Sequence, residues 1–349
     1  MKRRLDIAQD KLTPADLVSA ILRAPVYLIW NGGIGTYFKS TTESHAEAGD
    51  KSNDSVRING AEIRARVVGE GGNLGMTQLA RVEYALRGGA LNTDFIDNSA
   101  GVDCSDHEVN IKILLNDVVG DGDLTEKQRR ELLEQMSTDV AELVLKNNYR
   151  QTQAIGIAAY EALKRAGEYR RLIASLESSG LLSRALEFIP EDDVLSERRT
   201  QKQALTRPEL AVLIAYVKGM LKQDLAASSL PDDAYVSKII ATAFPPVLSE
   251  RYPVQMGRHR LRREIIATQA ANDMVNRMGI TFVDRMRAST GYGCADVTRA
   301  YVTARDIFDM QTHWSAIEAL DNQVEDSLQL QLFSELTRLV RRATRWFLR

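Results

Sequence analysis

Hydrophobic positions in the first third of the chain form short runs that end in glycine-rich polar loops. The runs at residues 26–30, 63–69 and 90–96 are followed by the loops NGGIGTY (31–37), EGGNLG (70–75) and DNSAGVDCSDHEV (97–109). Short apolar runs that alternate with turns and helical stretches are typical of an α/β unit with parallel strands. The pattern therefore predicts three strands, each with a polar loop at its carboxyl end.

From about Asp117 the spacing of apolar positions becomes helical. The segment GDGDLTEKQ (120–128) interrupts the earlier pattern, and apolar residues then recur every three or four positions. Thr125 with Gln128 and Thr206 with Glu209 have the spacing of a capping box, which favours a helix start. We predict helices over residues 154–172, 208–225, 261–278 and 328–348, with a proline-rich interruption at 245–253.

The two patterns divide the chain into two predicted domains. Residues 1–118 are expected to form an α/β portion with an incomplete, Rossmann-like parallel sheet, and residues 119–349 a mostly α-helical domain. Ligands of open α/β sheets bind beyond the carboxyl ends of the strands, so the three loops are expected to form one side of a cleft. An incomplete sheet exposes an edge, and we therefore expect association, as a homo-oligomer.

Composition and charge restrict the class of partner. The 349 residues are 44% hydrophobic and 26% charged, with a formal net charge of -2, so no bulk field would attract nucleic acid or an anionic membrane. There is no signal-like apolar segment behind the basic start and no uncharged apolar run of ~20 residues, so we expect a cytoplasmic protein. Cys104 and Cys294 lie outside any CxxC pattern, which argues against a disulfide framework or a structural zinc site.

The glycine loops do not carry a recognisable phosphate-binding motif. A GxGxxG fingerprint would need glycine where Phe38 follows Gly33 and Gly35, and no GxxxxGK[ST] is present. NGGIGTY is therefore either a ligand-contacting loop or an ordinary strand-to-helix turn. EGGNLG offers the donor and acceptor of Asn73 beside glycines that allow close approach, although a turn explains it equally well.

The acidic loop at residues 97–109 invites two other interpretations, which its spacing does not support. Its acidic residues flank a single His107 and would point in different directions on a helix, so we expect no metal. Ser105 and His107 are two residues apart and do not face each other on a helix, which argues against a serine hydrolase. Cys104 is expected to be a small packed residue. The arginine runs at 258–263 and 338–349 are expected to be solvated helix faces.

Three long segments resemble the large bacterial NAD-specific glutamate dehydrogenases. They are LIWNGGIGTYFKSTTESHAEAGDKSND, RARVVGEGGNLGMTQLARVEYALRGG and NTDFIDNSAGVDCSDHEVNIKILLN. The resemblance continues through RPELAVLIAYVKGML, FPPVLSERYP and HRLRREIIATQAANDMVNRMGITFV and covers essentially the whole chain. It corresponds to the C-terminal portion of these enzymes, which comprises the end of the catalytic α/β domain and a helical C-terminal domain.

The resemblance implies cofactor contacts for five residues. EGGNLG is similar to the Glu-Gly-Ala-Asn-Met-Pro turn of the smaller glutamate dehydrogenases, which places Gly72 and Asn73 beside the nicotinamide ribose of NAD. NSAGV is similar to their Asn-Ala-Gly-Gly-Val, which places Asn98 near the nicotinamide carboxamide. Asn31 and Gly32 correspond less closely to the Pro-Ala-Ala loop that borders the cofactor.

The resemblance also implies a substrate pocket. Val102 and Ser105 have the spacing of the valine and serine that line the pocket for the glutamate side chain. Asp103, Cys104, Asp106 and His107 depart from the smaller enzymes, which have Ala, Thr, Gly and Leu there, and the departures put the geometry around Ser105 in doubt.

The implied reaction is oxidative deamination of L-glutamate to 2-oxoglutarate and ammonia with reduction of NAD. The catalytic lysine and the glycine fingerprint of the family precede the first residue of this chain, so we expect no catalytic residue within it and no activity without the N-terminal part of the same enzyme. The alternative is that the helical region after Asp117 makes the chain a non-catalytic assembly or regulatory module of a multi-subunit enzyme.

Overall fold

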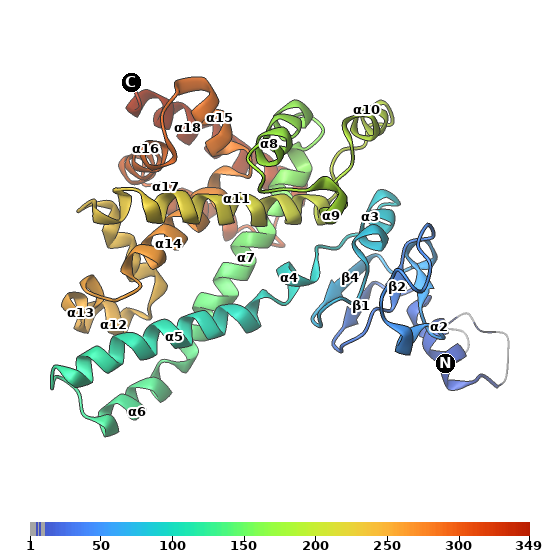
Figure 1. Ribbon diagram of the computed structural model, residues 1–349, viewed down its shortest axis with the longest axis horizontal. Helices are drawn as coiled ribbons and strands as arrows, with labels where there is room; N and C mark the ends of the chain where they lie inside the picture. Colours follow the sequence, from blue (N-terminus) through green and yellow to red (C-terminus); the bar gives the residue numbers. More distant parts are fainter. Residues whose placement is uncertain (1–4, 6, 8–10) are drawn as a thin grey trace. The chain divides into compact units, whose positions relative to one another are not determined.

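The structure, a computed structural model, describes residues 5, 7 and 11–349 (Figure 1). Its contacts group the chain into two compact units. The first comprises the chain up to Ser99 with Ala162–Ala166 and Leu176–Leu213, and the second comprises Ala100–Glu161, Gly167–Ser175 and Ile214–Arg349. The predicted division between residues 118 and 119 stays a prediction, because a packing unit need not coincide with a family domain.

The first unit contains two pairs of parallel strands. Strand β1 (Leu28–Asn31) pairs with β4 (Val67–Glu70), with Leu28 opposite Val67 and Asn31 opposite Glu70. Strand β2 (Phe38–Lys39) pairs with β3 (Ile58–Asn59). Because β1 and β4 are parallel and in register, the glycine-rich loops that follow them leave the sheet from the same edge.

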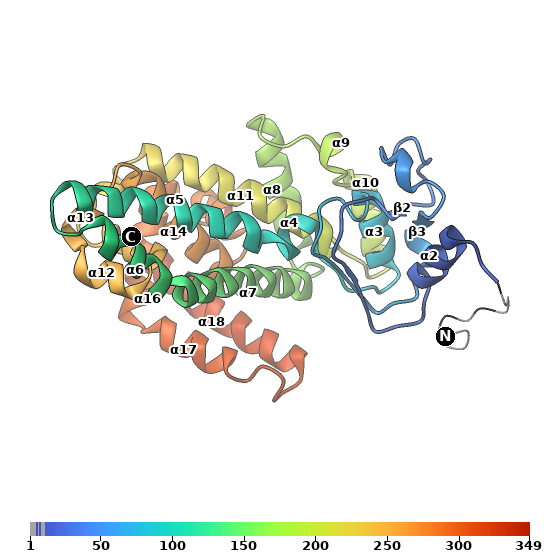
Figure 2. The ribbon, with the colours of Figure 1, turned by 90° about the horizontal axis from the view of Figure 1, so that it is seen from below.

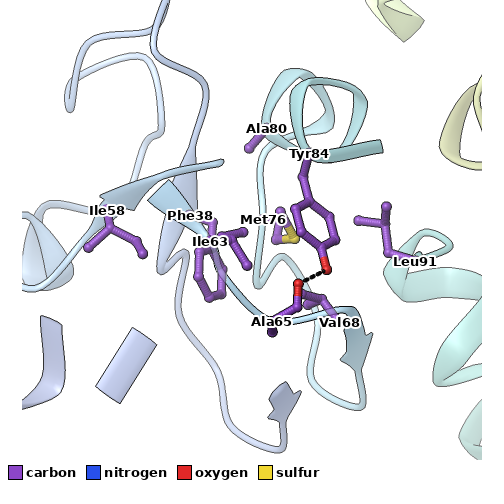
Figure 3. Packing of buried hydrophobic residues seen from close by; sticks show 9 residues of the cluster. All are labelled: Phe38, Ile58, Ile63, Ala65, Val68, Met76, Ala80, Tyr84 and Leu91. Carbon is purple, nitrogen blue, oxygen red and sulfur yellow. Dashed lines mark hydrogen bonds between the residues drawn. The ribbon is translucent and has the colours of Figure 1, made fainter. Parts of the chain in front are cut away.

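The core of the first unit lies between these strands and helix α3 (Gln78–Leu86) (Figure 3). Tyr84 on α3 is 3% exposed and donates its hydroxyl hydrogen to the carbonyl oxygen of Ala65 at 2.7 Å, which satisfies a polar group inside an apolar cluster. Thr77 caps the helix by accepting a hydrogen bond from the Ala80 N–H. The other members of the cluster are Phe38, Ile58, Ile63, Val68, Met76 and Leu91.

The third predicted strand, at residues 90–96, is wrong beyond its first residue. Ala90 forms an isolated parallel bridge with Val67, and the chain then turns into the short helix α4 (Asp94–Asp97). The Asp94 carboxylate accepts the N–H of Leu74 at 2.8 Å, and the Asp97 carboxylate accepts the N–H of Glu70 at 2.9 Å. The helical turn brings both carboxylates to the β4 loop, and these tertiary hydrogen bonds override the strand propensity of the segment.

The remaining elements of the first unit are short. They are α2 (Pro14–Leu22), η1 (Lys51–Asn53), η2 (Gly60–Glu62), α9 (Arg184–Glu187) and α10 (Asp192–Thr200).

The second unit is helical, and α14 (Arg262–Met278) lies at its centre. This helix has ten buried residues and contacts η4 (Val236–Ala243), α7 (Ser137–Glu161) and α18 (Asp326–Phe347). A helix buried around most of its circumference belongs to the interior of a bundle. The α/β portion followed by a mostly helical portion was therefore predicted correctly, whereas the Rossmann-like topology stays a prediction.

Most of the predicted helices are present. Residues 208–225, 261–278 and 328–348 fall in α11 (Arg207–Ala227), α14 and α18. The capping box of Thr125 and Gln128 forms at the start of α6 (Glu126–Gln135), and Glu209 accepts the Thr206 N–H as predicted. One continuous helix was predicted at 154–172, and this is wrong. The segment contains the end of α7 at Glu161, a turn, and the start of α8 (Ala166–Ser178).

Helix α5 (Ser99–Gly120) opens the helical part of the chain, and α18 closes it against α16 (Cys294–Ile307) and α17 (Met310–Glu318) (Figure 2). Within the described residues, no helix has both the length and the apolar character needed to cross a bilayer. The further elements are α12 (Pro246–Arg251), α13 (Pro253–Gly257), α15 (Phe282–Thr290) and η3 (Leu230–Asp232).

Candidate functional site

The loops after β1 and β4 meet at the edge of the first unit's sheet. The N–H of Gly72 donates to the carbonyl oxygen of Asn31 at 2.9 Å, so the tips of NGGIGTY and EGGNLG are joined backbone to backbone. A Cβ atom on Gly72 would collide with the carbonyl oxygen of Gly33. Glycine is therefore required at residue 72 by close approach of two backbones.

Two asparagine amides form the exposed part of this meeting point. The Asn98 Nδ2 group donates to Asn73 Oδ1 at 2.6 Å, although the two residues are 25 positions apart. Asn98 is the C-cap of α4, and Asn73 precedes Leu74, which has a positive φ of 56°. The pair leaves one amide oxygen and one amide nitrogen free to face a ligand with hydroxyl or carboxamide groups.

Asn31 contributes a buried hydrogen-bond donor to the same region. Its Oδ1 accepts the N–H of Gly33 at 3.4 Å, whereas its Nδ2 is buried and has no partner among the described residues. A Cβ atom on Gly75 would collide with this nitrogen. An unsatisfied buried donor is costly, so this position favours an acceptor supplied by water or by a ligand. Gly32 is exposed, and a Cβ atom there would touch the indole of Trp30 at 3.7 Å.

A buried network of charges lies beneath the EGGNLG loop. Arg81 on α3 donates to both carboxylate oxygens of Glu70, at 2.7 and 2.8 Å, and lies 3.2 Å from a carboxylate oxygen of Asp94. Glu70 is 1% exposed and Arg81 is 5% exposed. The three carboxylates of Glu70, Asp94 and Asp97 accept the N–H groups of Met76, Leu74 and Glu70, so the network fixes the backbone on both sides of Asn73.

Burial disfavours charge in this network, and it raises the pKa of Glu70 against the hydrogen bonds and charge of Arg81. Burial alone would lower the pKa of Arg81, but the hydrogen bonds and charge of Glu70 outweigh it and raise that pKa. Burial raises the pKa of Asp97, against hydrogen bonds donated by the Asn92 amide and the Glu70 N–H. Paired and fully hydrogen-bonded charges of this kind hold a loop in one shape.

The sequence reasoning did not identify Glu70, Arg81, Asp94 or Asp97 as parts of the site. Glu70, Arg81 and Asp94 are 11 to 24 positions apart, and only Asp94 and Asp97 are close in sequence. The one signal was Glu70 at the end of a buried apolar run, since a carboxylate in such a place needs a buried partner.

Val102 and Ser105 belong to the second unit, on the first turns of α5. They are three residues apart and so share a face of the helix. Val102 is 69% exposed, and the Ser105 hydroxyl makes only a long 3.5 Å hydrogen bond to the Gly101 carbonyl oxygen. Both side chains are thus accessible on one helical face.

His107 does not pair with Ser105, in agreement with their spacing. Its Nδ1 lies 2.9 Å from the Ala243 carbonyl oxygen, and its Nε2 lies 3.7 Å from Asp103 Oδ1. Cys104 was expected to be packed, but it is exposed, because the buried residues of α5 begin only at His107, after the first two turns of that helix. In the part of the chain that the structure describes, no three acidic, histidine or cysteine side chains form a metal-binding group.

The chain matches two family models in sequence. Residues 1–158 match the family described as bacterial NAD-glutamate dehydrogenase, catalytic domain, and residues 202–349 match glutamate dehydrogenase, C-terminal.

Curated relatives extend the match to the whole chain. The NAD-specific glutamate dehydrogenase of Pseudomonas aeruginosa is 59% identical over all 349 residues, and that of Halomonas elongata is 54% identical. The enzyme of the same name from Mycobacterium tuberculosis is 43% identical over 344 residues. The chain covers 22% of the length of the first two relatives and 21% of the third. Residues 1–158 and 202–349 are thus similar to the two matched families, and the chain spans about a fifth of the length of these relatives.

Proposed function

We propose that this chain forms the nicotinamide and glutamate wall of an NAD-dependent glutamate dehydrogenase. The observation that carries the proposal is the meeting of three loops at one sheet edge, where Gly72 binds Asn31 and Asn98 binds Asn73. The names of the relatives supply the reaction, the oxidation of glutamate by NAD.

The polar groups at the loops fit the nicotinamide and ribose end of NAD. The Asn73 and Asn98 amides and the unpaired Asn31 Nδ2 offer donors and acceptors that match ribose hydroxyls and a carboxamide. The close approach of Gly72 to Gly33 leaves backbone, not side chains, at the surface that would face the ring. The chemistry that NAD supplies when bound is hydride acceptance, and Asn31, Asn73 and Asn98 would orient it.

The proposed role of α5 is to hold the substrate. Val102 would contact the aliphatic part of glutamate, and the Ser105 hydroxyl would donate to its side-chain carboxylate. Hydride transfer needs the donor carbon and the acceptor ring in a near-attack geometry, and each unit would contribute the orientation of one of them. Proton transfer is assigned to a lysine outside this chain.

The first unit exposes apolar side chains that further residues of the enzyme would cover. Leu28 is 53% exposed, Trp30 is 60% exposed and Val67 is 41% exposed, all on the β1 and β4 pair. An isolated two-stranded pair is marginal in water, and an apolar face on it favours coverage by further structure. We therefore infer that the chain alone does not oxidise glutamate.

A chimeric enzyme tests the proposal. The chain replaces the 349 matching residues of the Pseudomonas aeruginosa relative, and glutamate-dependent NADH formation is followed by absorbance for the chimera and for the chain alone. The chimera should be active and the chain alone inactive. Turnover by the purified chain alone would contradict the assignment of proton transfer to a residue outside it.

Variants of the chimera test the individual residues. Asn98→Ala should raise the KM for NAD roughly threefold to tenfold, the equivalent of one neutral hydrogen bond. Ser105→Ala should raise the KM for glutamate by about tenfold, because the lost hydrogen bond is to a charged group. Ser137→Ala is the matched control for Ser105, since its hydroxyl also bonds a carbonyl four residues earlier, that of Leu133 at 3.4 Å. Unchanged kinetics in both site variants would instead support an assembly or regulatory module.

A further inference from the structure

The C-terminal helix α18 carries a run of arginines after its last acidic residue, Glu335. After Glu335 the sequence contains five arginines and no aspartate or glutamate. Arg338 is paired with Glu335 at 2.9 Å, so the last acidic residue of the helix is already used. Arg341, Arg342 and Arg345 then follow at spacings of one, three and four residues. Like charges at such spacing destabilise a helix unless another group compensates them.

These three arginines line a hollow shared with α15. The hollow has a volume of about 230 Å³ and is lined by Arg285, Met286 and Ser289 of α15 and by Arg341, Arg342 and Arg345 of α18. Four of its six lining residues are arginines, and no acidic residue is among those that line it in the described part of the chain. The helices α15 and α18 are in contact within the second unit, so the lining comes from packed elements.

Arg285 is held in place by Glu168, which lies outside the arginine hollow. Its Nη1 donates to Glu168 Oε1 at 2.6 Å, and the Thr281 hydroxyl donates to Glu168 Oε2 at 2.9 Å. Glu168 lies in an adjoining hollow of about 170 Å³ that shares Arg285 and Ser289 with the first. Its carboxylate therefore orients Arg285 without lining the arginine hollow. Among the described residues Arg342 and Arg345 form no ion pair, so their charge is available to a ligand.

We propose that this hollow binds a compact phosphate anion with at least two phosphoryl groups. Guanidinium groups form paired hydrogen bonds with phosphate oxygens, and a set of arginines without lysine favours such planar recognition. The volume lies below the roughly 300–1,000 Å³ of sites for drug-sized ligands, which suits a small anion. A nucleic acid or a membrane would need a broad basic surface, whereas the chain has a net charge of -2 and the arginines are gathered around one concavity.

Calorimetric titration of the full 349-residue chain with inorganic pyrophosphate tests the proposal at 0.15 M salt. Saturable binding with one site per chain is expected. Arg342→Gln and Arg345→Gln should each weaken the affinity by roughly tenfold or more, the equivalent of one charge-assisted hydrogen bond. Arg338→Gln removes the same charge from the same helix outside the hollow and should change the affinity less than about twofold.

Two controls show whether a change in pyrophosphate binding is specific to the arginine hollow. Asn98→Ala, at the proposed nicotinamide loops, should bind pyrophosphate as tightly as the unmodified chain, so the outcome does not depend on the proposed dehydrogenase function. Circular dichroism checks that each variant is folded. Absence of saturable pyrophosphate binding, equal weakening by Arg338→Gln, or tighter binding to duplex DNA or anionic vesicles than to pyrophosphate would each overturn the proposal.

Discussion

Two buried cations, one in each unit, have opposite kinds of partner. In the first unit Arg81 is surrounded by carboxylates and makes two hydrogen bonds to Glu70. In the second unit Lys218 on α11 is 8% exposed and donates to a neutral group, Gln151 Oε1, at 2.8 Å. Burial lowers the pKa of Lys218 to about 7, with a further contribution from the charge of Lys222. In the first arrangement a paired cation opposes the effect of burial on the carboxylates, whereas in the second burial favours loss of the charge.

The difference follows from what each group supports. The carboxylates around Arg81 accept backbone N–H groups of the loop that carries Asn73, and the hydrogen bonds and charge of Arg81 favour their ionised form against burial. Lys218 joins α11 to α7 through Gln151 and needs only a donor, which a neutral amine still supplies. Buried charge is retained where it organises several backbone groups at once.

The largest expected effect is on the paired network. Arg81→Met leaves Glu70 and Asp94 buried without their cation and should lower the free energy of unfolding by about 3–5 kcal/mol in a urea titration. Arg87→Met, at the C-cap of the same helix, should stay within about 0.5 kcal/mol of the unmodified chain. A loss below about 1 kcal/mol for Arg81→Met would contradict the stabilising role of the network.

The second expected effect is a dependence of the free energy of unfolding on pH that is caused by Lys218. Its folded-state pKa of about 7 lies below the ordinary lysine pKa of 10.5, so the unfolded chain binds more protons between these values. The free energy of unfolding should therefore rise with pH from about pH 7 to 10, by up to about 1.4 kcal/mol per unit. Below pH 7 the lysine is charged in both states and the full cost of burying it remains.

Lys218→Met should remove this part of the rise of the free energy of unfolding with pH, measured in urea titrations between pH 7 and 10. Lys222→Met, at an exposed position on the same helix, removes only the smaller contribution to the pKa of Lys218 and should keep most of this slope. An identical slope in Lys218→Met and the unmodified chain would mean that Lys218 is charged inside the fold.

A third effect contrasts glycines of the two units. Gly72→Ala forces a Cβ atom against the Gly33 carbonyl oxygen and should cost about 1–3 kcal/mol, measured by urea unfolding. Gly219→Ala, on α11 with no atom near its Cβ position, should instead stabilise by roughly 0.5–1 kcal/mol because alanine favours the helix. Effects of the same sign at both positions would contradict the close approach of the two loops.

The smallest effect distinguishes two helix caps. Thr125→Ala should cost about 1 kcal/mol, the usual value for a lost N-cap. Thr77→Ala should cost more, because the Thr77 hydroxyl also donates to Glu43 Oε2 at 2.5 Å in addition to capping α3. Comparison of the two thermal unfolding curves checks the order, and a larger shift for Thr125→Ala would contradict it.

Much of the secondary structure could be predicted, because it depends on neighbours in the sequence. The caps at Thr125 and Thr206 and the helices α11, α14 and α18 follow from apolar spacing and local hydrogen bonds. The strand predicted at residues 90–96 failed because Asp94 and Asp97 bond distant N–H groups, which local propensity does not register.

The candidate site was predicted as loops but not as an arrangement. Asn31, Asn73 and Asn98 were identified from strings that resemble a family, whereas the contact of Asn73 with Asn98 and the unpaired Asn31 Nδ2 required coordinates. The partners lie 25 or more residues apart, and no spacing rule connects such positions.

The sequence by itself determined the order of an α/β portion and a helical portion, the similarity to the two matched families, and the places where glycine loops follow apolar runs. Only the tertiary structure decided that Arg81 binds Glu70 beneath one loop, that Lys218 is buried without an acidic partner, and that arginines of α15 and α18 share a hollow. The physical reason is the distance along the chain over which each interaction acts. Periodicity and capping act over a few residues, whereas charge pairing and burial depend on which distant segments the packed core brings together.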